Sequence, residues 1–174
     1  GTQTSTFSIN LLQDISLSPA LINFPTLVQG RTNIQSSSTT IITNNGNFDS
    51  SDGFVSVIAS NLVGESNPAE IIPASNFKAA SASQADICTT GTTLQHAIST
   101  QIPSITLPRG PAGSNTEEIS YCLTLVPVGI SSQFYSATQA QGNGWTITLL
   151  AAPLPLFIRR KKKKTAINKS NLLN

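Results

Sequence analysis

The stretch Glu117-Glu-Ile-Ser-Tyr-Cys-Leu-Thr-Leu-Val126 decides the fold class of this chain. Apolar and polar residues alternate along it, which is typical of a β-strand with one buried face. The alternation predicts a buried face formed by Ile119, Tyr121, Leu123 and Leu125. Cys122 then lies on the opposite face of the same strand.

The same two-residue alternation recurs in short segments before and after this stretch, separated by Gly, Pro and Asn clusters. These predicted strands include residues 4–12, 38–43, 54–59, 134–138 and 145–149. Gly64, Pro68 and Pro73 predict a loop over residues 62–73 with at most one short strand. No helical pattern alternates with the strands, so we expect an all-β protein. The expected architecture is a single antiparallel β-sandwich, Ig-like or jelly-roll, of seven to nine strands.

Charge divides the 174-residue chain into two unlike parts. Only 10% of the residues are charged, against about 25% in an average soluble domain. Seven of the ten Lys and Arg residues follow Ile158, whereas all eight acidic residues precede it. We therefore expect an extended N-terminal strand over residues 1–12, a sandwich over residues 13–152, and a Pro-containing elbow with a basic C-terminal tail over residues 153–174.

An apolar run over residues 149–158 precedes the basic residues, in the order that a membrane anchor would have. The run is shorter than the ~20 residues that a membrane-spanning helix needs, and it contains Pro153 and Pro155. We expect a last strand that leaves the body along an extended path. The chain is therefore not predicted to span a membrane.

Cys88 and Cys122 are the only cysteines, and His96 is the only histidine. A Cys/His metal site needs three or four ligands, so these residues do not predict one. We expect a disulfide between the two cysteines, with two separate buried thiols as the alternative. No metal ion or other cofactor is expected.

The sequence offers no catalytic constellation. His96 lies in an alternating segment, no G-x-S-x-G motif is present, and the neighbours Glu117 and Glu118 point to opposite faces of a strand. Asp49 and Asp52 share a loop with three Asn residues, which suits Ca²⁺ in ligand type but not in spacing, so a polar turn is the preferred interpretation. We predict that the protein is not an enzyme.

The chain contains no methionine. We interpret this as the removal of a secretory signal peptide, which predicts an extracellular, cell-surface location. Removal of an initiator methionine alone is the alternative. Asn168-Lys-Ser170 is a candidate N-glycosylation site in an exported chain.

The basic tail consists of Arg159, Arg160, Lys161, Lys162, Lys163 and Lys164. Such a run can bind nucleic acid through phosphates or lie on an anionic membrane surface. It can also stay solvated, or pair with the acidic body of another copy of the chain. No aromatic residue interrupts the run, so stacking on single-stranded bases is not predicted.

Three segments resemble the opening of secreted prokaryotic Ig-like sandwiches: Ile15-Ser-Leu-Ser-Pro-Ala-Leu-Ile-Asn-Phe24, Val28-Gln-Gly30 and Thr40-Ile-Ile-Thr-Asn-Asn-Gly-Asn47. The whole pattern is similar to subunits of archaeal bundling pili and of TasA-like biofilm fibres. The resemblance implies a Thr/Ser/Asn-rich β-sandwich that polymerises by donating its N-terminal strand to the next subunit. Residues 2–12 would be the donor, with Phe7, Ile9 and Leu11 as the anchors that fill a groove. The basic tail departs from the pattern of that family.

The leading hypothesis is therefore a structural subunit of an extracellular filament or surface layer whose partner is a second copy of itself. The alternative is a viral coat protein with a jelly-roll body and a tail that contacts nucleic acid. A third reading is an adhesive or carbohydrate-binding domain that uses Tyr121, Tyr135 and Trp145, although core packing is the better account of Tyr121 and Trp145. None of these hypotheses needs a small-molecule substrate.

Overall fold

The computed structural model describes residues 12–50, 54–110, 114–137 and 144–149. These residues are mostly β, and every pair of neighbouring strands is antiparallel, as the sequence predicts. The strands are β1 (Ile15–Ser18), β2 (Thr32–Gln35), β3 (Thr40–Asn44), β4 (Val55–Ile58), β5 (Leu62–Gly64), β6 (Ile71–Ile72), β7 (Phe77–Ser81), β8 (Thr92–Thr93), β9 (Ser99–Gln101), β10 (Thr116–Leu125), β11 (Tyr135–Ser136) and β12 (Thr146–Leu149). A 3-10 turn, η1 (Ala74–Asn76), and a short helix, α1 (Ile87–Thr90), complete the elements.

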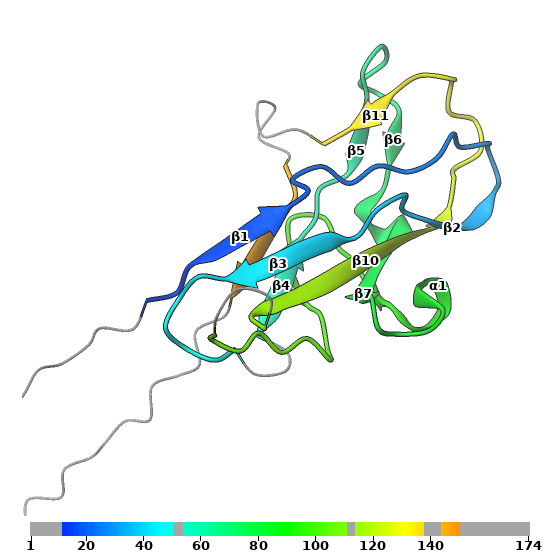
Figure 1. Ribbon diagram of the computed structural model, residues 1–174. Helices are drawn as coiled ribbons and strands as arrows, with labels where there is room; N and C mark the ends of the chain where they lie inside the picture. Colours follow the sequence, from blue (N-terminus) through cyan, green and yellow to red (C-terminus); the bar gives the residue numbers. More distant parts are fainter. Residues whose placement is uncertain (1–11, 51–53, 111–113, 138–143, 150–174) are drawn as a thin grey trace, which may run out of the picture.

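Strand β10 is the centre of the largest sheet, whose order is β1-β3-β10-β7-β8, with β2 also paired to β10 (Figure 1). This strand is the segment that the sequence pattern predicts most clearly, and the structure confirms it. Its long alternating run allows β3 and β2 to pair in succession along one edge while β7 pairs along the other. β10 therefore positions most of the inner face of the sheet.

The inner face of β10 carries Ile119, Tyr121 and Leu123, all fully buried. Leu125 was expected on this face too, but 43% of it is exposed. The reason is the end of the sheet: pairing with β7 stops at Leu123, and only β2 accompanies the last residues of β10. The prediction of the buried face is therefore correct for three of its four residues.

α1 covers the outer face of β10 around Cys122. Cys122 and Cys88 form a disulfide with a Cα–Cα distance of 5.2 Å. Ala80 and Ile87 pack with the two cysteines in a small buried cluster. A strand residue that ordinarily faces solvent is thereby buried.

Two smaller sheets, β11-β5-β6 and β12-β4-β9, lie beyond the inner face of the large sheet. One core connects them to it, because Val57 of β4, Ile72 of β6 and Phe77 of β7 belong to the same buried cluster as Tyr121. Residues 62–73, expected to form a loop with at most one strand, contain both β5 and β6. Strands of two and three residues are too short to show a period in the sequence.

The start and the end of the described chain lie together at one end of the molecule. Gln13 and Ile15 share a small cavity with Thr148 and Leu149. The backbone of Leu12 is held by Asn47: the Leu12 N–H donates to Oδ1 of Asn47 at 2.7 Å. β2 lies at the opposite end of the large sheet from the beginning of β1 (Figure 1).

Candidate binding groove

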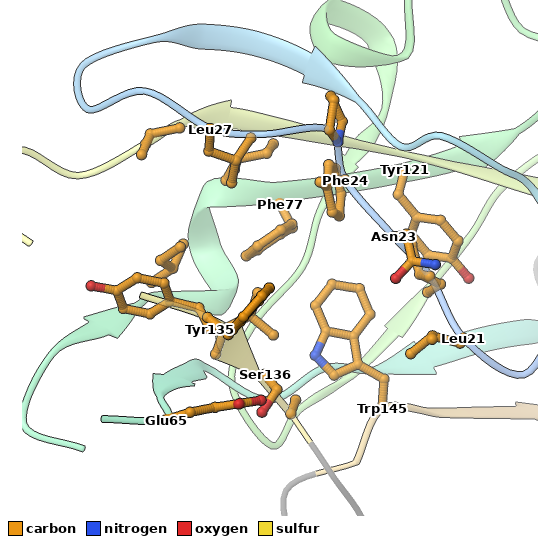
Figure 2. Close-up of a pocket in the computed structure, with 18 of the residues that line it drawn as sticks. Leu21, Asn23, Phe24, Leu27, Glu65, Phe77, Tyr121, Tyr135, Ser136 and Trp145 are labelled. Carbon is orange, nitrogen blue, oxygen red and sulfur yellow. The ribbon is translucent and has the colours of Figure 1, made fainter. Parts of the chain in front are cut away.

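A large, mainly apolar cavity of about 1380 Å³ runs between the sheets, and we call it the groove. One wall is the continuous segment of residues 19–29, and the other is residues 130–137. Residues of β1, β3, β4, β5, β6, β7, β10 and β12 complete the lining. Figure 2 shows Leu21, Phe24 and Leu27 on one side of the space and Tyr135 and Ser136 on the other.

A row of four aromatic rings lies along the groove. Phe24 contacts Phe77 with ring centroids 5.5 Å apart, Phe77 contacts Trp145 at 5.2 Å, and Trp145 contacts Tyr121 at 5.9 Å. All three pairs meet edge to face, an arrangement that suits the aromatic quadrupole. The indole N–H of Trp145 donates to the carbonyl of Ser60 at 2.8 Å, which fixes this ring in the groove.

Two hydroxyl groups in the core beside the groove have no hydrogen-bond partner of ordinary geometry within the described part of the chain. They are the Tyr121 Oη and the Thr40 Oγ1, on residues that are 0% and 3% exposed. Burial raises the pKa of Tyr121 to about 12, and the Thr40 hydroxyl lies close enough to lower it slightly, although the pair does not form a hydrogen bond of ordinary geometry. Both hydroxyls therefore lie in the core behind the groove and are closed off from solvent.

The first wall of the groove is extended but belongs to no strand. In residues 19–28, one backbone hydrogen bond reaches a distant part of the described chain, from the Ser37 N–H to the Asn23 carbonyl at 2.8 Å. Ile22, Phe24 and Leu27 pack against the core, so the segment covers it by side-chain contact. Pro25 has no N–H to donate, which prevents a regular ladder along this wall.

The second wall is held by the carboxylate of Glu70, in the turn that joins β5 to β6. Its Oε2 accepts hydrogen bonds from the Ser131 N–H at 2.6 Å, the Ser131 hydroxyl at 2.7 Å, the Tyr135 hydroxyl at 2.7 Å and the Gln133 amide at 2.9 Å. These bonds, that from Tyr135 first, lower the pKa of Glu70 from 4.5 to about 2. Burial, followed by the bond to Glu70, raises the pKa of Tyr135. Sequence analysis missed this cluster, because Glu70 and Tyr135 are remote from each other in the sequence.

The rim of the groove exposes large apolar side chains. Phe134 is 81% exposed, Leu21 is 66% exposed and Val28 is 62% exposed, and all three line the groove. Single exposed apolar residues are ordinary on a protein surface, whereas a group of them around one apolar opening makes the groove a candidate binding site.

The residues predicted to act as anchors, Phe7, Ile9 and Leu11, lie outside the described residues. The basic tail, Arg159 to Lys164, and the glycosylation candidate Asn168 also lie outside them. Tyr121, Tyr135 and Trp145, considered from the sequence as a sugar platform, all line the groove. Tyr121 is fully buried, as the core-packing interpretation requires.

The other residues that the sequence singled out for chemistry have structural roles in the described chain. His96 is exposed, and its Nδ1 accepts a hydrogen bond from the Asn61 N–H at 3.3 Å. Asn44 is buried, and its amide donates to the carbonyls of Phe48 and Leu107. Asp49 pairs with Arg109 at 3.7 Å. Across the described ranges, no three His, Cys, Asp or Glu side chains gather in a metal-binding cluster.

Comparison with known proteins found no family model, curated protein or solved structure that matches this chain. Neither helical element in the described ranges is long and apolar enough to cross a membrane.

Proposed function

We propose that the protein is a structural subunit of an extracellular filament and that it polymerises head to tail by strand donation. In this proposal the three sheets form one Ig-like or jelly-roll sandwich. Residues 2–12 of one copy enter the groove of the next, and Phe7, Ile9 and Leu11 fill it. The observation that carries the proposal is the open apolar groove along the core.

The groove is open to water and has a volume of about 1380 Å³, so an extended apolar surface stays hydrated until a partner covers it. This volume is larger than the roughly 300–1,000 Å³ of pockets for small molecules. A strand that carries three large apolar side chains on one face suits a space of this size and lining. The groove therefore supports a peptide occupant better than a small ligand.

A backbone edge is available beside this space. β12 pairs with β4 on one side and with no other strand in the described ranges, and Ile147 of β12 lines the groove. An extended segment can add to such an edge through main-chain hydrogen bonds while alternate side chains enter the groove. Residues 2–12 contain no proline, so each of their backbone N–H groups can donate a hydrogen bond. Residues 19–29, the first wall of the groove, contain Pro25, which has no N–H group.

The position of the N-terminal segment favours a donor from a second copy. Leu12 is tied to Asn47 at one end of the molecule, and the turn at residues 29–30, which borders the groove, lies near β2 at the other end (Figure 1). Eleven extended residues reach at most about 40 Å, enough to lie along a neighbouring subunit. Repeated contacts of this heterologous kind do not close, so they produce filaments.

The composition suits such an assembly. A body with few charges loses little hydration free energy when copies meet. The disulfide between Cys88 and Cys122 suits an oxidising environment outside the cell.

The proposal is tested with the full chain carrying Phe7→Asp and Ile9→Asp. We expect the unmodified chain to form long polymers in electron micrographs and to sediment, whereas the variant stays monomeric. The matched control is Thr6→Asp with Ser8→Asp, which adds the same charge on the opposite face of the donor and should preserve polymers. Polymers of the Phe7/Ile9 variant would contradict strand donation.

The same particles distinguish a filament from a coat. We expect them to contain no nucleic acid after nuclease treatment. Protected nucleic acid that is lost when the chain is truncated after Ile158 would replace this proposal with the coat-protein alternative.

A further inference from the structure

The first described residues are tied to one turn of the body by backbone hydrogen bonds. The Leu12 N–H donates to Oδ1 of Asn47 at 2.7 Å, and the Asn47 N–H donates to the Leu12 carbonyl at 3.1 Å. The Asn45 N–H donates to the Asp14 carbonyl at 2.9 Å, so these bonds continue the pairing of β1 with β3. We call residues 12–14 and 44–47 the base.

The turn in the base is itself locked to the body. The buried Asn44 side chain accepts a hydrogen bond from the Gly46 N–H at 2.9 Å and donates to the carbonyls of Phe48 and Leu107. Gly46 lies so close to Leu12 that a Cβ at this position would overlap the Leu12 carbonyl oxygen. Glycine permits this close approach of two backbones. Residue 12 is therefore held against a turn that has little freedom to move.

Two loops meet at the other end of the large sheet, next to β2 (Figure 1). We call residues 28–31 and 126–129 the tip. The loops are bonded to each other, since the Val126 N–H donates to the Arg31 carbonyl at 2.9 Å. Val28 and Val126 line the groove. Val28 is 62% exposed, Val128 is 77% exposed, and Arg31 is exposed. The tip thus presents two apolar side chains and one positive charge beside the groove.

Strand donation leaves no linker between the bodies of two copies. In the proposed function Leu11 fills the groove of the acceptor, and the next residue, Leu12, is hydrogen-bonded to the body of the donor. Consecutive Cα atoms are about 3.8 Å apart, so the base of the donor must contact the acceptor where Leu11 enters. Leu12 is 54% exposed in a single copy, and this contact would cover it.

The base of the donor meets the tip of the acceptor. In a polymer the base of each copy already contacts the copy that receives its strand, so the donor body lies at the other end of the groove, where the tip is. The two surfaces are complementary: Leu12 and Asp14 are exposed on the base, and Val28, Val128 and Arg31 are exposed on the tip. Apolar side chains and opposite charges then face each other across the contact.

We propose that the base of each copy docks on the tip of the copy that receives its strand, with Asp14 facing Arg31, and that this contact makes the filament stiff. The inference rests on the function proposed above. Hydrogen bonds within each body hold both surfaces, so successive bodies take one fixed orientation. Repetition of one fixed orientation produces a regular filament.

The first experiment inserts Gly-Ser-Gly-Ser between Leu11 and Leu12 of the full chain, which preserves the donor and the groove but separates the two bodies. We expect polymers whose axial repeat is longer by up to about 14 Å. Their persistence length in electron micrographs should fall at least about threefold, because a Gly/Ser linker is flexible. The matched control carries the same insertion between Gly1 and Thr2 and should form polymers like those of the unmodified chain.

The second experiment reverses the charges of the two surfaces. Asp14→Arg and Arg31→Asp should each raise the critical concentration for polymers at least about threefold at low salt. The chain with both changes should return to within about twofold of the unmodified chain. A residue 1–12 peptide, which lacks the base, should bind the Phe7→Asp, Ile9→Asp chain equally well with and without Arg31→Asp. Thermal melting confirms that each variant is folded.

Two results would overturn the docking of base on tip. One is a filament of the Leu11/Leu12 insertion variant with the repeat and stiffness of the unmodified filament. The other is a double charge reversal that assembles no better than either single variant. In both cases strand donation itself would stand. If the unmodified chain forms no polymers and its groove binds no residue 1–12 peptide, both proposals are wrong.

Discussion

The two faces of β10 (Thr116–Leu125) are covered in different ways. On the outer face, α1 and the Cys88–Cys122 disulfide cover a small cluster whose cysteines are at most 7% exposed. On the inner face, the side chains of β10 are buried, but the core beside them opens into the groove. The disulfide covers part of the outer face within one copy of the chain, whereas the groove beside the inner face has room for a segment of another copy. The outer face should therefore determine the stability of the monomer, and the inner face its assembly.

The largest expected effect on stability comes from the outer face. Replacing Cys88 and Cys122 with Ala should lower the free energy of unfolding by about 2–5 kcal/mol, because the unfolded chain gains freedom and the outer cluster loses atoms. Urea denaturation of monomeric chains measures the difference. Both chains, with and without the Cys substitutions, also carry Phe7→Asp and Ile9→Asp, so that neither of them polymerises during the measurement.

A second experiment measures polymer formation by the chain that carries Cys88→Ala and Cys122→Ala but keeps Phe7 and Ile9. Below its melting temperature, polymers should still form, since the groove does not contain the disulfide. Loss of polymers from a chain that is still folded would contradict the separation of roles.

A smaller effect is expected at the wall of the groove. The pKa of Glu70 is lowered from 4.5 to about 2 by its hydrogen bonds, chiefly that from Tyr135. The carboxylate network therefore stabilises the fold fully above about pH 4.5, and this contribution declines as the pH falls toward 2. Glu70→Gln should lower the melting temperature at pH 7, and the difference from the unmodified chain should vanish near pH 2.

Glu65→Gln is the matched control, since Glu65 also lines the groove but lies outside the Glu70 network. At pH 7 it should change the melting temperature less than Glu70→Gln does, because Glu65 makes none of these hydrogen bonds. If Glu70→Gln lowers the melting temperature as much at pH 2 as at pH 7, the charge of the Glu70 carboxylate does not stabilise the fold, and the prediction is wrong.

The smallest effect is expected from the hydroxyl of Tyr121. In a monomer this group is buried without a partner, so Tyr121→Phe should change the free energy of unfolding by less than about 1 kcal/mol, in the stabilising direction. Denaturant titration of the monomeric background measures it. A loss of several kcal/mol would mean that the hydroxyl is satisfied within one copy.

Local patterns predict one face of this molecule better than the other. The alternation around Tyr121 predicted β10, and the two cysteines suggested the pairing that closes the outer face. No local sequence pattern predicts the groove, because its walls are segments that are far apart in the sequence and meet only in the folded chain. Glu70 meets Ser131 and Tyr135 only after folding, and β5 and β6 are too short to show a period.

The wall of residues 19–28 shows a further limit of sequence reasoning. Ile22 and Phe24 alternate with Asn23 as they would in a strand, and both pack against the core. Pro25 nevertheless prevents a continuous ladder, and the segment covers the core without joining a sheet. The alternation agrees with the side chains that face inward, but it does not show whether the backbone finds a partner.

The central claim, that the groove receives the N-terminal strand of another copy, is tested most directly by the emission of Trp145. It is the only tryptophan in the chain and lies in the aromatic row of the groove, beside Phe77 and Tyr121. Titration of the residue 1–12 peptide into the Phe7→Asp, Ile9→Asp chain should shift its emission to shorter wavelength and saturate, as the ring loses contact with water. A peptide with Phe7, Ile9 and Leu11 replaced by Ser should leave the spectrum unchanged. An emission spectrum that the unmodified peptide does not alter at any concentration would contradict the account.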